Sequence, residues 1–398
     1  MAAKTRILFV DDEPLVLQGL QRLLRSMRGE WDMVFVTSGA EGLEELARAP
    51  FDVVVADMRM PGMNGAEFLN RVMRLYPGTI RLVLSGQADS DLILQVEGAA
   101  HQFLSKPCDP GILRTVIQSA SEIGGRLRSD EIRRVLGGIS HLPVLPAAYQ
   151  EIQALLAIEA TTVEDLGRVV EKDPGMTGNI LKLVNSAYFG LRQRVSDPAE
   201  AVAFLGFDTL KALALVHGIF QQVRDFPPGF NGGHLWRHSL ELAAGARGIA
   251  RHEGLGREQA ADCFTGGLLH DIGLLLMASG FPAEYQRISG LLASGGVELL
   301  DAEMDVLGVH HGEVGAHLLG LWGLPGAVVE AVAHHHGPRP ALGITPEVIV
   351  HAAEVLSTSV GDFQVFGLHR DVDDAPIEDL LGPRLPAWKG ILDRLREA

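Results

Sequence analysis

The chain has 398 residues, 47% of them hydrophobic and 21% charged, which is enough for two or three folded domains. Its formal net charge of −16 at pH 7 argues against a nucleic-acid partner, because such surfaces need clustered Lys and Arg. The two cysteines form no CxxC pair and the N-terminal apolar run is short, so we expect a cytoplasmic protein without membrane insertion.

Short aliphatic runs alternate with amphipathic stretches over the first part of the chain. The runs are RILFV, DMVFVT, DVVVAD, IRLVLSG and HQFLSKP. Continuous apolar strands alternating with helices are typical of a parallel sheet covered on both faces. We therefore predict an α/β domain with a doubly wound, five-stranded parallel sheet over residues 1–122.

Polar side chains follow the predicted strands. Asp11 and Asp12 come after the first strand, Asp57 after the third, Ser85 after the fourth and Lys106 after the fifth. Carboxyl ends of parallel strands share one edge of a sheet, where three carboxylates need a hard cation such as Mg²⁺ among them. Lys106 and Ser85 beside them suit a phosphoryl group, so the pattern predicts Asp57 as a phosphoacceptor.

The motifs ILFVDDEP, VVVADMRMPGMNG, LVLSG and FLSKP resemble the receiver domain of two-component response regulators over its whole length. This resemblance implies a flavodoxin-like fold and a sensor histidine kinase as the phosphodonor. It also implies that the carbonyl of Arg59 is a Mg²⁺ ligand. Phe103 would be the aromatic switch that turns inward with Ser85 on phosphorylation, although simple core filling explains Phe103 equally well.

The sequence changes character after the predicted sheet. Helical periodicity with paired glycines predicts a connector at 123–138, which is also a candidate homodimer contact. Helical periods broken by Pro and Gly predict an all-α domain at 139–345 and a helical C-terminal extension at 346–398. Thr162, followed by Asp165 in the first turn, predicts a helix N-cap.

Histidines gather in this helical region. They occur in LWRHS (His238), LLHDIG (His270, beside Asp271), VHHGEVG (His310, His311) and AHHHG (His334, His335, His336). Burying Asp271 among leucines would be costly unless a cation or hydrogen bonds compensate its charge. The sequence therefore predicts a metal cage built from several helices, suited to Fe, Mn or Zn.

The order H…HD…H…HH resembles the HD superfamily of metal-dependent phosphohydrolases. Successive helical side chains point about 100° apart, so the three consecutive histidines cannot all face one ion. Glu354 stands where the superfamily has its last metal-binding Asp, and we include it in the cage. The ligands that the resemblance implies are His238, His270, Asp271, His311, His334, His335 and Glu354.

A narrower resemblance covers residues from about 135 to 340. The segments ISHLPVLPAAYQEI, VVEKDPGMTGNILKLVNSAYFG, GLLHDIG and LWGLP resemble the HDOD domain, the HD-related output domain. This family implies a two-lobed helical fold with a signalling role. The chain lacks the Gly-Tyr-Pro motif of the HD-GYP phosphodiesterases, and Leu274 stands where those enzymes usually have a lysine.

Three functions therefore stay open. The preferred one is a response regulator in which Asp57 phosphorylation controls a helical output domain that acts through an unidentified protein partner or dimerisation. The second is a metal-dependent phosphohydrolase acting on a cyclic dinucleotide or nucleotide. The third is a metal- or nucleotide-sensing output domain.

Overall fold

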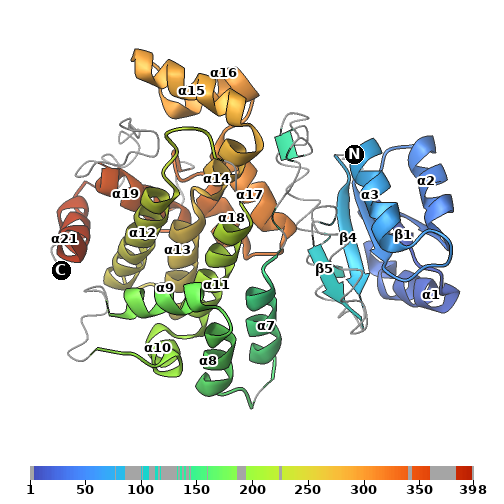
Figure 1. The fold of residues 1–398 in the computed structure, drawn as a ribbon, viewed down its shortest axis with the longest axis horizontal. Coiled ribbons are helices and arrows are strands. Elements are labelled where there is room, and N and C mark those ends of the chain that lie inside the picture. Colours follow the sequence, from blue (N-terminus) through green and yellow to red (C-terminus); the bar gives the residue numbers. More distant parts are fainter. Residues whose placement is uncertain are drawn as a thin grey trace. The chain divides into compact units, whose positions relative to one another are not determined.

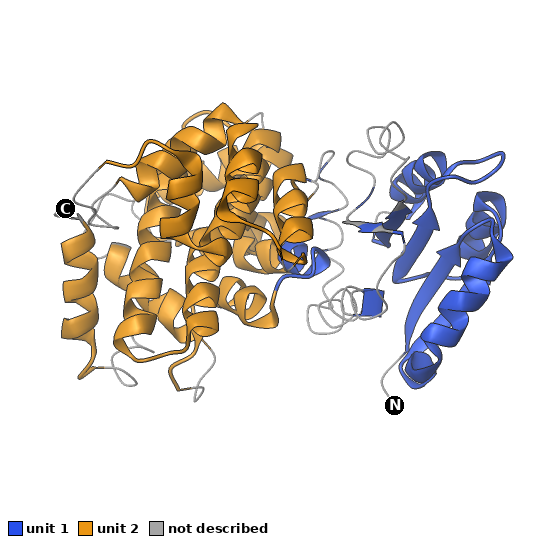
Figure 2. Ribbon diagram, turned by 90° about the horizontal axis from the view of Figure 1, so that it is seen from below, with its two compact units in different colours: residues 1–144, 317–324 blue, residues 145–316, 325–398 orange. Residues whose placement is uncertain are grey.

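The computed structural model divides into two compact units. Unit 1 comprises residues 1–144 and 317–324, and unit 2 comprises residues 145–316 and 325–398 (Figure 2). The structure describes residues 4–76, 78–85, 100, 102–106, 113–114, 117, 132, 135–136, 139, 143, 145–158, 160–185, 194–223, 226–338, 343–358 and 382–396.

Unit 1 contains a five-stranded parallel sheet with the strand order β2-β1-β3-β4-β5 (Figure 1). The chain builds outward from β1 in one direction and from β3 in the other, so the switch point lies between these two strands. This topology confirms the predicted doubly wound α/β fold. The strands are β1 (Thr5–Val10), β2 (Trp31–Val36), β3 (Val53–Asp57), β4 (Ile80–Ser85) and β5 (Gln102–Ser105).

Helices cover both faces of this sheet. Ile7 and Phe9 of β1 belong to the same buried core as Leu17, whereas Leu8 lies in a second core with Phe68. Because both faces are buried, the strands read as continuous apolar runs rather than as alternating ones. The helical elements are α1 (Pro14–Leu23), the 3₁₀ helix η1 (Arg25–Gly29), α2 (Gly39–Arg48) and α3 (Gly65–Leu75).

Unit 2 is helical throughout its described residues, as predicted. Helix α8 begins with a capping box, since the Thr162 hydroxyl accepts from the Asp165 N–H at 3.2 Å and the Asp165 carboxylate accepts from the Thr162 N–H at 2.9 Å. This confirms the predicted N-cap. The helices are α7 (Ala147–Leu156), α8 (Val163–Glu171), α9 (Pro174–Val184), α10 (Pro198–Leu205), α11 (Phe207–Gln222), α12 (Gly232–His252), α13 (Arg257–Leu269), α14 (Ile272–Gly280), α15 (Pro282–Ser294), α16 (Leu299–Leu307), α17 (His311–Leu321), α18 (Gly326–Ala333), α19 (Pro346–Thr358) and α21 (Leu385–Arg396).

Close helix packing holds the histidine-bearing segments of unit 2 together. Helices α12, α13, α18 and α19 pack against one another in its core (Figure 1). A Cβ on Gly267 of α13 would lie 2.9 Å from the Cα of Ala243 on α12, and one on Gly273 would collide with the carbonyl oxygen of His311. Glycine at these two positions therefore allows the backbones to approach where the histidines lie.

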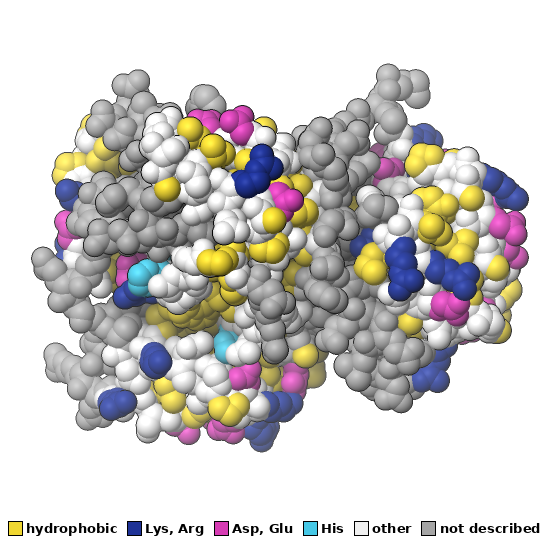
Figure 3. Space-filling model, turned by 45° about the horizontal axis from the view of Figure 1, so that its top comes forward, with side chains coloured by type: hydrophobic (Ala, Val, Ile, Leu, Met, Phe, Trp, Pro, Cys, Tyr) yellow, Lys and Arg dark blue, Asp and Glu magenta, His cyan; other side chains and the backbone are white. Residues whose placement is uncertain are grey.

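One stretch of unit 2, Arg257–Gly280, is long and apolar enough to cross a membrane, but 83% of its most apolar window is buried inside the protein. Burial of this kind is expected for the core helix of a folded domain. On the face shown in Figure 3, hydrophobic and charged side chains are mixed, and histidines colour only small areas. This view agrees with the burial of His270, His311 and His335.

Candidate phosphoacceptor and metal sites

The strand ends of unit 1 bring Asp11, Asp57 and Lys106 together. The Lys106 Nζ lies 2.8 Å from Oδ2 of Asp11 and also forms an ion pair with Asp57. Both carboxylates are buried, whereas the Lys106 side chain keeps 26% of its exposure. The pocket therefore places one fixed ammonium between two buried carboxylates, at the switch point of the sheet.

The Asp57 carboxylate is held at both oxygens. Its Oδ2 accepts from the backbone N–H of Arg59 at 2.9 Å, and its Oδ1 pairs with Lys106. Burial raises the pKa of Asp57, and the charge of Asp11 adds to this, against the opposing effect of Lys106. Burial lowers the pKa of Lys106, but its hydrogen bonds to Asp11 and Asp57 outweigh burial and raise it.

The other predicted residues of this pocket are less well defined. Asp12 is partly buried directly after Asp11, and the backbone of Arg59 reaches the pocket through its N–H. The side chains of Ser85 and Phe103 lie outside the described part of the structure, as does nearly all of the connector at 123–138. Their predicted roles stay predictions.

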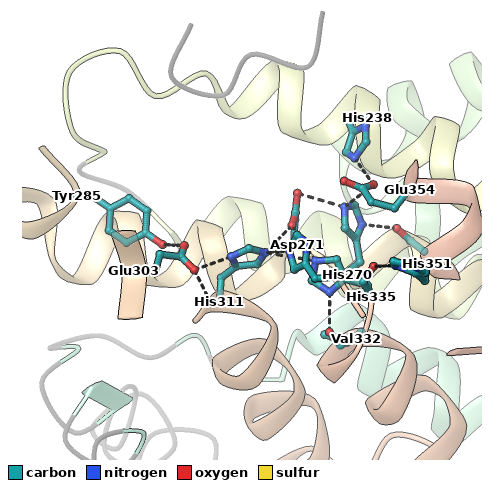
Figure 4. Close-up of polar contacts among 12 residues, drawn as sticks. His238, His270, Asp271, Tyr285, Glu303, His311, Val332, His335, His351 and Glu354 are labelled. Atoms are coloured by element: carbon teal, nitrogen blue, oxygen red, sulfur yellow. Dashed lines mark hydrogen bonds and ion pairs between the residues drawn. The ribbon is translucent and has the colours of Figure 1, made fainter. Parts of the chain in front are cut away.

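In unit 2, side chains from five separate segments converge on one buried region, which we call the histidine cluster (Figure 4). His238 comes from α12, His270 and Asp271 from the junction of α13 and α14, and Glu354 from α19. Ligand atoms lie within 4.8 Å of one another in each of two groups that could hold a metal ion. The groups are Asp271, His311, His335 and His336, and His238, His270 and Glu354.

Asp271 faces both groups of the histidine cluster. Its Oδ1 lies 3.2 Å from Nε2 of His311 and 3.5 Å from Nε2 of His335. Its Oδ2 lies 3.1 Å from Nε2 of His270. This nearly fully buried carboxylate therefore lies between the two ligand groups and would offer one oxygen to each.

Backbone carbonyls fix the orientation of two imidazoles in the cluster. Nδ1 of His270 donates to the carbonyl of Gly267 at 2.8 Å, and Nδ1 of His335 donates to that of Val332 at 2.7 Å. Burial lowers the pKa of His335 to about 3, so its ring is neutral. The Nε2 lone pair of such a ring points at the carboxylate oxygens of Asp271, and a cation between these donors would relieve their repulsion.

The second group completes this arrangement. Nε2 of His238 lies 2.9 Å from Oε2 of Glu354, and Nε2 of His270 lies 3.6 Å from the same oxygen. Glu354 is fully buried on α19. The longer side chain therefore brings a carboxylate to the cluster at the place where the HD superfamily resemblance has aspartate.

The run of three histidines differs from the prediction. His334 lies outside the cluster, with its side chain 36% exposed and its Nε2 3.5 Å from Oε2 of Glu330. His336 lies in the cluster instead, with its Nε2 2.9 Å from that of His311. Helix α18 ends at Ala333, so the three histidines follow a turn and the spacing of a single helical face does not apply to them.

Sequence reasoning missed Glu303, Tyr285 and His351, which lie around the cluster. Oε2 of Glu303 accepts from Nδ1 of His311 at 2.8 Å, and its Oε1 accepts from the Tyr285 hydroxyl at 2.5 Å. Nδ1 of His351 donates to the carbonyl of His335 at 2.7 Å. Glu303 precedes the buried Leu307 by four residues, so its place on the apolar face of a helix was the signal available.

The Glu303–His311 pair shifts both titrations. Burial opposes ionisation of Glu303, but the charge of His311 and the hydrogen bonds from His311 and Tyr285 lower its pKa. Burial lowers the pKa of His311, whereas Glu303 and Asp271 outweigh burial and raise it to about 9. A proton on His311 therefore balances part of the buried carboxylate charge when no metal is bound.

Two family models match the chain. The model of the response regulator receiver domain matches residues 7–118, and the model of the HDOD domain matches residues 142–338. Glu354 and His351 lie beyond the matched HDOD segment, on α19. The histidine cluster thus draws on residues outside the part of the chain that the family model covers.

Two relatives each match part of the chain. An uncharacterized protein of Treponema pallidum is 30% identical over 205 residues, which are 50% of this chain and 38% of that protein. The hydrogenase transcriptional regulatory protein HoxA of Cupriavidus necator is 37% identical over 141 residues, which are 35% of this chain and 28% of that protein. The chain therefore spans less than half the length of these relatives.

A solved structure shares the helical fold. It is an HDOD domain protein with unknown function from Geobacter sulfurreducens, with a TM-score of 0.53 and 23% sequence identity. The similarity covers 67% of this chain and 88% of that chain. At this identity the likeness shows the fold alone.

Proposed function

The chain belongs to the response regulators that join a receiver domain to an HDOD domain, and from this premise we propose that phosphorylation of Asp57 by a sensor histidine kinase controls the helical domain. The arrangement of Asp57 and Asp11 around Lys106 is the observation that carries this proposal. In it, the helical domain acts through a protein partner or through homodimerisation.

The pocket has the groups that phosphoryl transfer to a carboxylate needs. One Asp57 oxygen forms a bond to phosphorus while the bond from phosphorus to the donor nitrogen breaks. The Arg59 N–H and Lys106 hold the carboxylate in place, and Lys106 stays near the phosphoryl oxygens to balance their charge. In this proposal Ser85 donates a hydrogen bond to the phosphoryl group, and Phe103 turns inward.

Receiver domains generally bind Mg²⁺, and the donors of this pocket fit that ion. Carboxylate and carbonyl oxygens are the ligands that Mg²⁺ prefers. In our proposal Asp11, Asp12, Asp57 and the carbonyl of Arg59 hold it. When bound, Mg²⁺ supplies positive charge beside the oxygens of the transferred group.

We propose that the receiver domain spans 1–122, the connector 123–138, the HDOD domain 139–345 and the C-terminal extension 346–398. Because Glu354 of the extension lies in the histidine cluster, the extension belongs functionally to the HDOD domain. The helical domain can therefore be expected to need α19 for its site, although the HDOD family model ends at residue 338.

Labelling with acetyl phosphate and Mg²⁺ tests the phosphoacceptor. The wild-type chain should incorporate one phosphoryl group, detected by intact mass, and Asp57→Asn should incorporate none. Asp32→Asn, which changes an exposed aspartate paired with Arg6, serves as the matched control and should label like the wild type. Equal labelling of Asp57→Asn and wild type would refute the assignment.

Hydrogen exchange of unit 2 tests the control of the helical domain. Treatment with acetyl phosphate and Mg²⁺ should change amide exchange in unit 2 of the wild type and leave that of Asp57→Asn unchanged. Sedimentation of both proteins before and after treatment shows whether the response is dimerisation. A phosphorylated wild type with unchanged exchange and unchanged mass in solution would contradict control of this domain.

We further propose that the histidine cluster binds one or two ions of Fe, Mn or Zn. Nitrogen and carboxylate donors suit these metals, and Asp271 faces both ligand groups. In this proposal His336 takes the place predicted for His334, next to His238, His270, His311, His335 and Glu354. When bound, such an ion supplies Lewis-acid chemistry.

The bridging position of Asp271 is also the observation that favours a second candidate function, a metal-dependent phosphohydrolase acting on a nucleotide or cyclic dinucleotide. Leu274 is uncharged and fully buried, so this position offers no cationic group to a phosphate. Assay of a nucleotide and cyclic dinucleotide panel with Mn²⁺ tests this candidate. Turnover that Asp271→Asn abolishes would support it, and no turnover by Mn²⁺-loaded protein would exclude it for these substrates.

A further inference from the structure

A buried polar chain connects the histidine cluster to the helical hairpin formed by α15 and α16 (Figures 1 and 4). Tyr285 lies on α15, Glu303 on α16, and His311 begins α17. All three side chains are fully buried. The chain of contacts therefore runs through the protein interior from the hairpin to Asp271.

Each contact in this chain is directional. The Tyr285 hydroxyl donates to Oε1 of Glu303 at 2.5 Å. Oε2 of Glu303 accepts from Nδ1 of His311 at 2.8 Å and from its backbone N–H at 2.9 Å. Because Nδ1 of His311 donates its hydrogen bond to Glu303, Nε2 is the ring atom that faces Asp271, at 3.2 Å.

Stability alone does not account for this row of buried polar contacts. Burying a carboxylate is costly, and a well-packed hydrophobic pair commonly stabilises a core as well as a buried ion pair does. The hairpin also buries the apolar side chains of Ile288 and Leu307, so packing of these helices does not itself require a carboxylate at Glu303. Its contacts serve the orientation of His311.

We propose that Tyr285 and Glu303 are positioning residues that make the α15–α16 hairpin respond to metal occupancy of the histidine cluster. This inference rests on the proposed metal centre. A cation at Nε2 of His311 would fix the position of the imidazole ring, so that its Nδ1 holds Glu303 in place, and Glu303 in turn holds the Tyr285 hydroxyl. Loading the cluster thereby tightens the packing of α15 against α16, and emptying it loosens the hairpin.

Two variants separate this role from general destabilisation. Glu303→Gln keeps the shape of the side chain but removes its charge, and Tyr285→Phe removes a single hydroxyl. Tyr149→Phe is the matched tyrosine control, because the buried Tyr149 hydroxyl accepts from Gln153 at 3.0 Å on α7. Glu253→Gln is the matched glutamate control, because Glu253 accepts from the Trp388 indole at 2.8 Å.

The experiment combines equilibrium dialysis with Mn²⁺ and hydrogen exchange of residues 282–307 in the full chain. Glu303→Gln should weaken Mn²⁺ binding by roughly 10-fold to 100-fold. Tyr285→Phe, which loses one hydrogen bond, should weaken it roughly threefold. Mn²⁺ should slow exchange of the hairpin amides in wild type and both controls, and this slowing should be lost in both test variants.

The outcomes distinguish the two proposals. If wild type and both test variants bind Mn²⁺ equally and their hairpins respond equally, the inference is overturned and the metal centre stands. If the wild type binds no Mn²⁺, both are overturned. Circular dichroism checks folding, and if Glu303→Gln does not fold, Tyr285→Phe carries the test.

Discussion

The two charged sites of this protein balance the charge of buried carboxylates in different ways. In unit 1, Lys106 lies between Asp11 and Asp57, so a cation belonging to the chain balances the buried carboxylates. In unit 2, the carboxylates of Asp271 and Glu354 face imidazoles, whose charge depends on bound protons or metal. The first site carries its own cation, whereas in our proposal the second takes up cations from solution.

This difference indicates how each site is used. A pocket that is balanced by a lysine can stay folded and empty until a phosphodonor arrives, as a switch requires. A cluster of imidazoles and buried carboxylates would be most stable when a metal fills it, so in our proposal the metal contributes to the stability of the fold. Changing the supply of cations should therefore affect the two units unequally.

Removal of metal should have the largest effect. If Mn²⁺ fills the cluster at 1,000 times its dissociation constant, linkage gives unit 2 about 4 kcal/mol of stability that EDTA removes. The urea midpoint of unit 2 should fall accordingly, as followed by tryptophan fluorescence and circular dichroism. The unfolding transition of unit 1 in the same sample is the internal control and should not move, because Lys106 remains. Equal shifts of both transitions would break the comparison.

Substitution of Asp271 should weaken metal binding more than substitution of His334, which lies outside the cluster. Asp271→Asn removes the charge that faces both ligand groups, so Mn²⁺ affinity should fall by at least about 100-fold in equilibrium dialysis. His334→Ala, which alters a partly exposed side chain paired with Glu330, should change the affinity by less than about threefold. The reverse order would restore His334 as the ligand.

The sequence predicts the two sites to different degrees for a physical reason. In a parallel sheet, strand ends meet at one edge whatever the loops do, so Asp11, Asp57 and Lys106 can be placed together from their positions after apolar runs. In a helical cage, the direction of a side chain depends on where its helix ends. Because α18 ends at Ala333, His336 and not His334 lies in the histidine cluster, and AVAHHHG does not place that end at one particular residue.

Glu303 shows a second limit of predicting the site from the sequence. The spacing from Leu307 places Glu303 on the apolar face of its helix, but acidic residues on helices are usually solvated, as the neighbouring Asp301 is. Only the packing of α16 against α15 buries Glu303 next to Tyr285. Long-range contacts of this kind have no period in the sequence, and they place the carboxylate of Glu303 beside His311.

Lys106 is the fixed cation of the unit 1 pocket, and its removal should make the carboxylates there depend on a bound cation for charge balance. Lys106→Met leaves Asp11 and Asp57 facing each other, which should cost about 2 kcal/mol in Mg²⁺-free buffer after allowance for the partial exposure of the lysine. Millimolar Mg²⁺ should restore most of that loss, measured as the urea midpoint of unit 1. Lys4→Met, which removes an exposed amine, is the control and should show neither effect. A Lys106→Met protein that is equally stable with and without Mg²⁺ would contradict the model of charge balance.

Asp262 on α13 is a carboxylate of unit 2 outside the cluster, and it tests how burial affects a carboxylate of this unit away from the proposed metal centre. Burial, followed by the charges of Glu258 and Asp208, raises the pKa of Asp262 to about 6. The folded protein therefore binds more protons than the unfolded chain between pH 4 and pH 6. Its contribution to stability is thus greatest at low pH and is lost as pH rises through about 6.

Asp262→Asn should remove this penalty and give the smallest effect of the series. The variant should be more stable than wild type by about 1 kcal/mol at pH 7, a value reduced for the half-exposed side chain, and should match wild type at pH 4. Urea midpoints of unit 2 at the two pH values measure this, with the exposed Asp305→Asn as control. A gain of the same size at pH 4 would assign it to packing rather than to charge, and carboxylates of this unit would then tolerate burial without a metal.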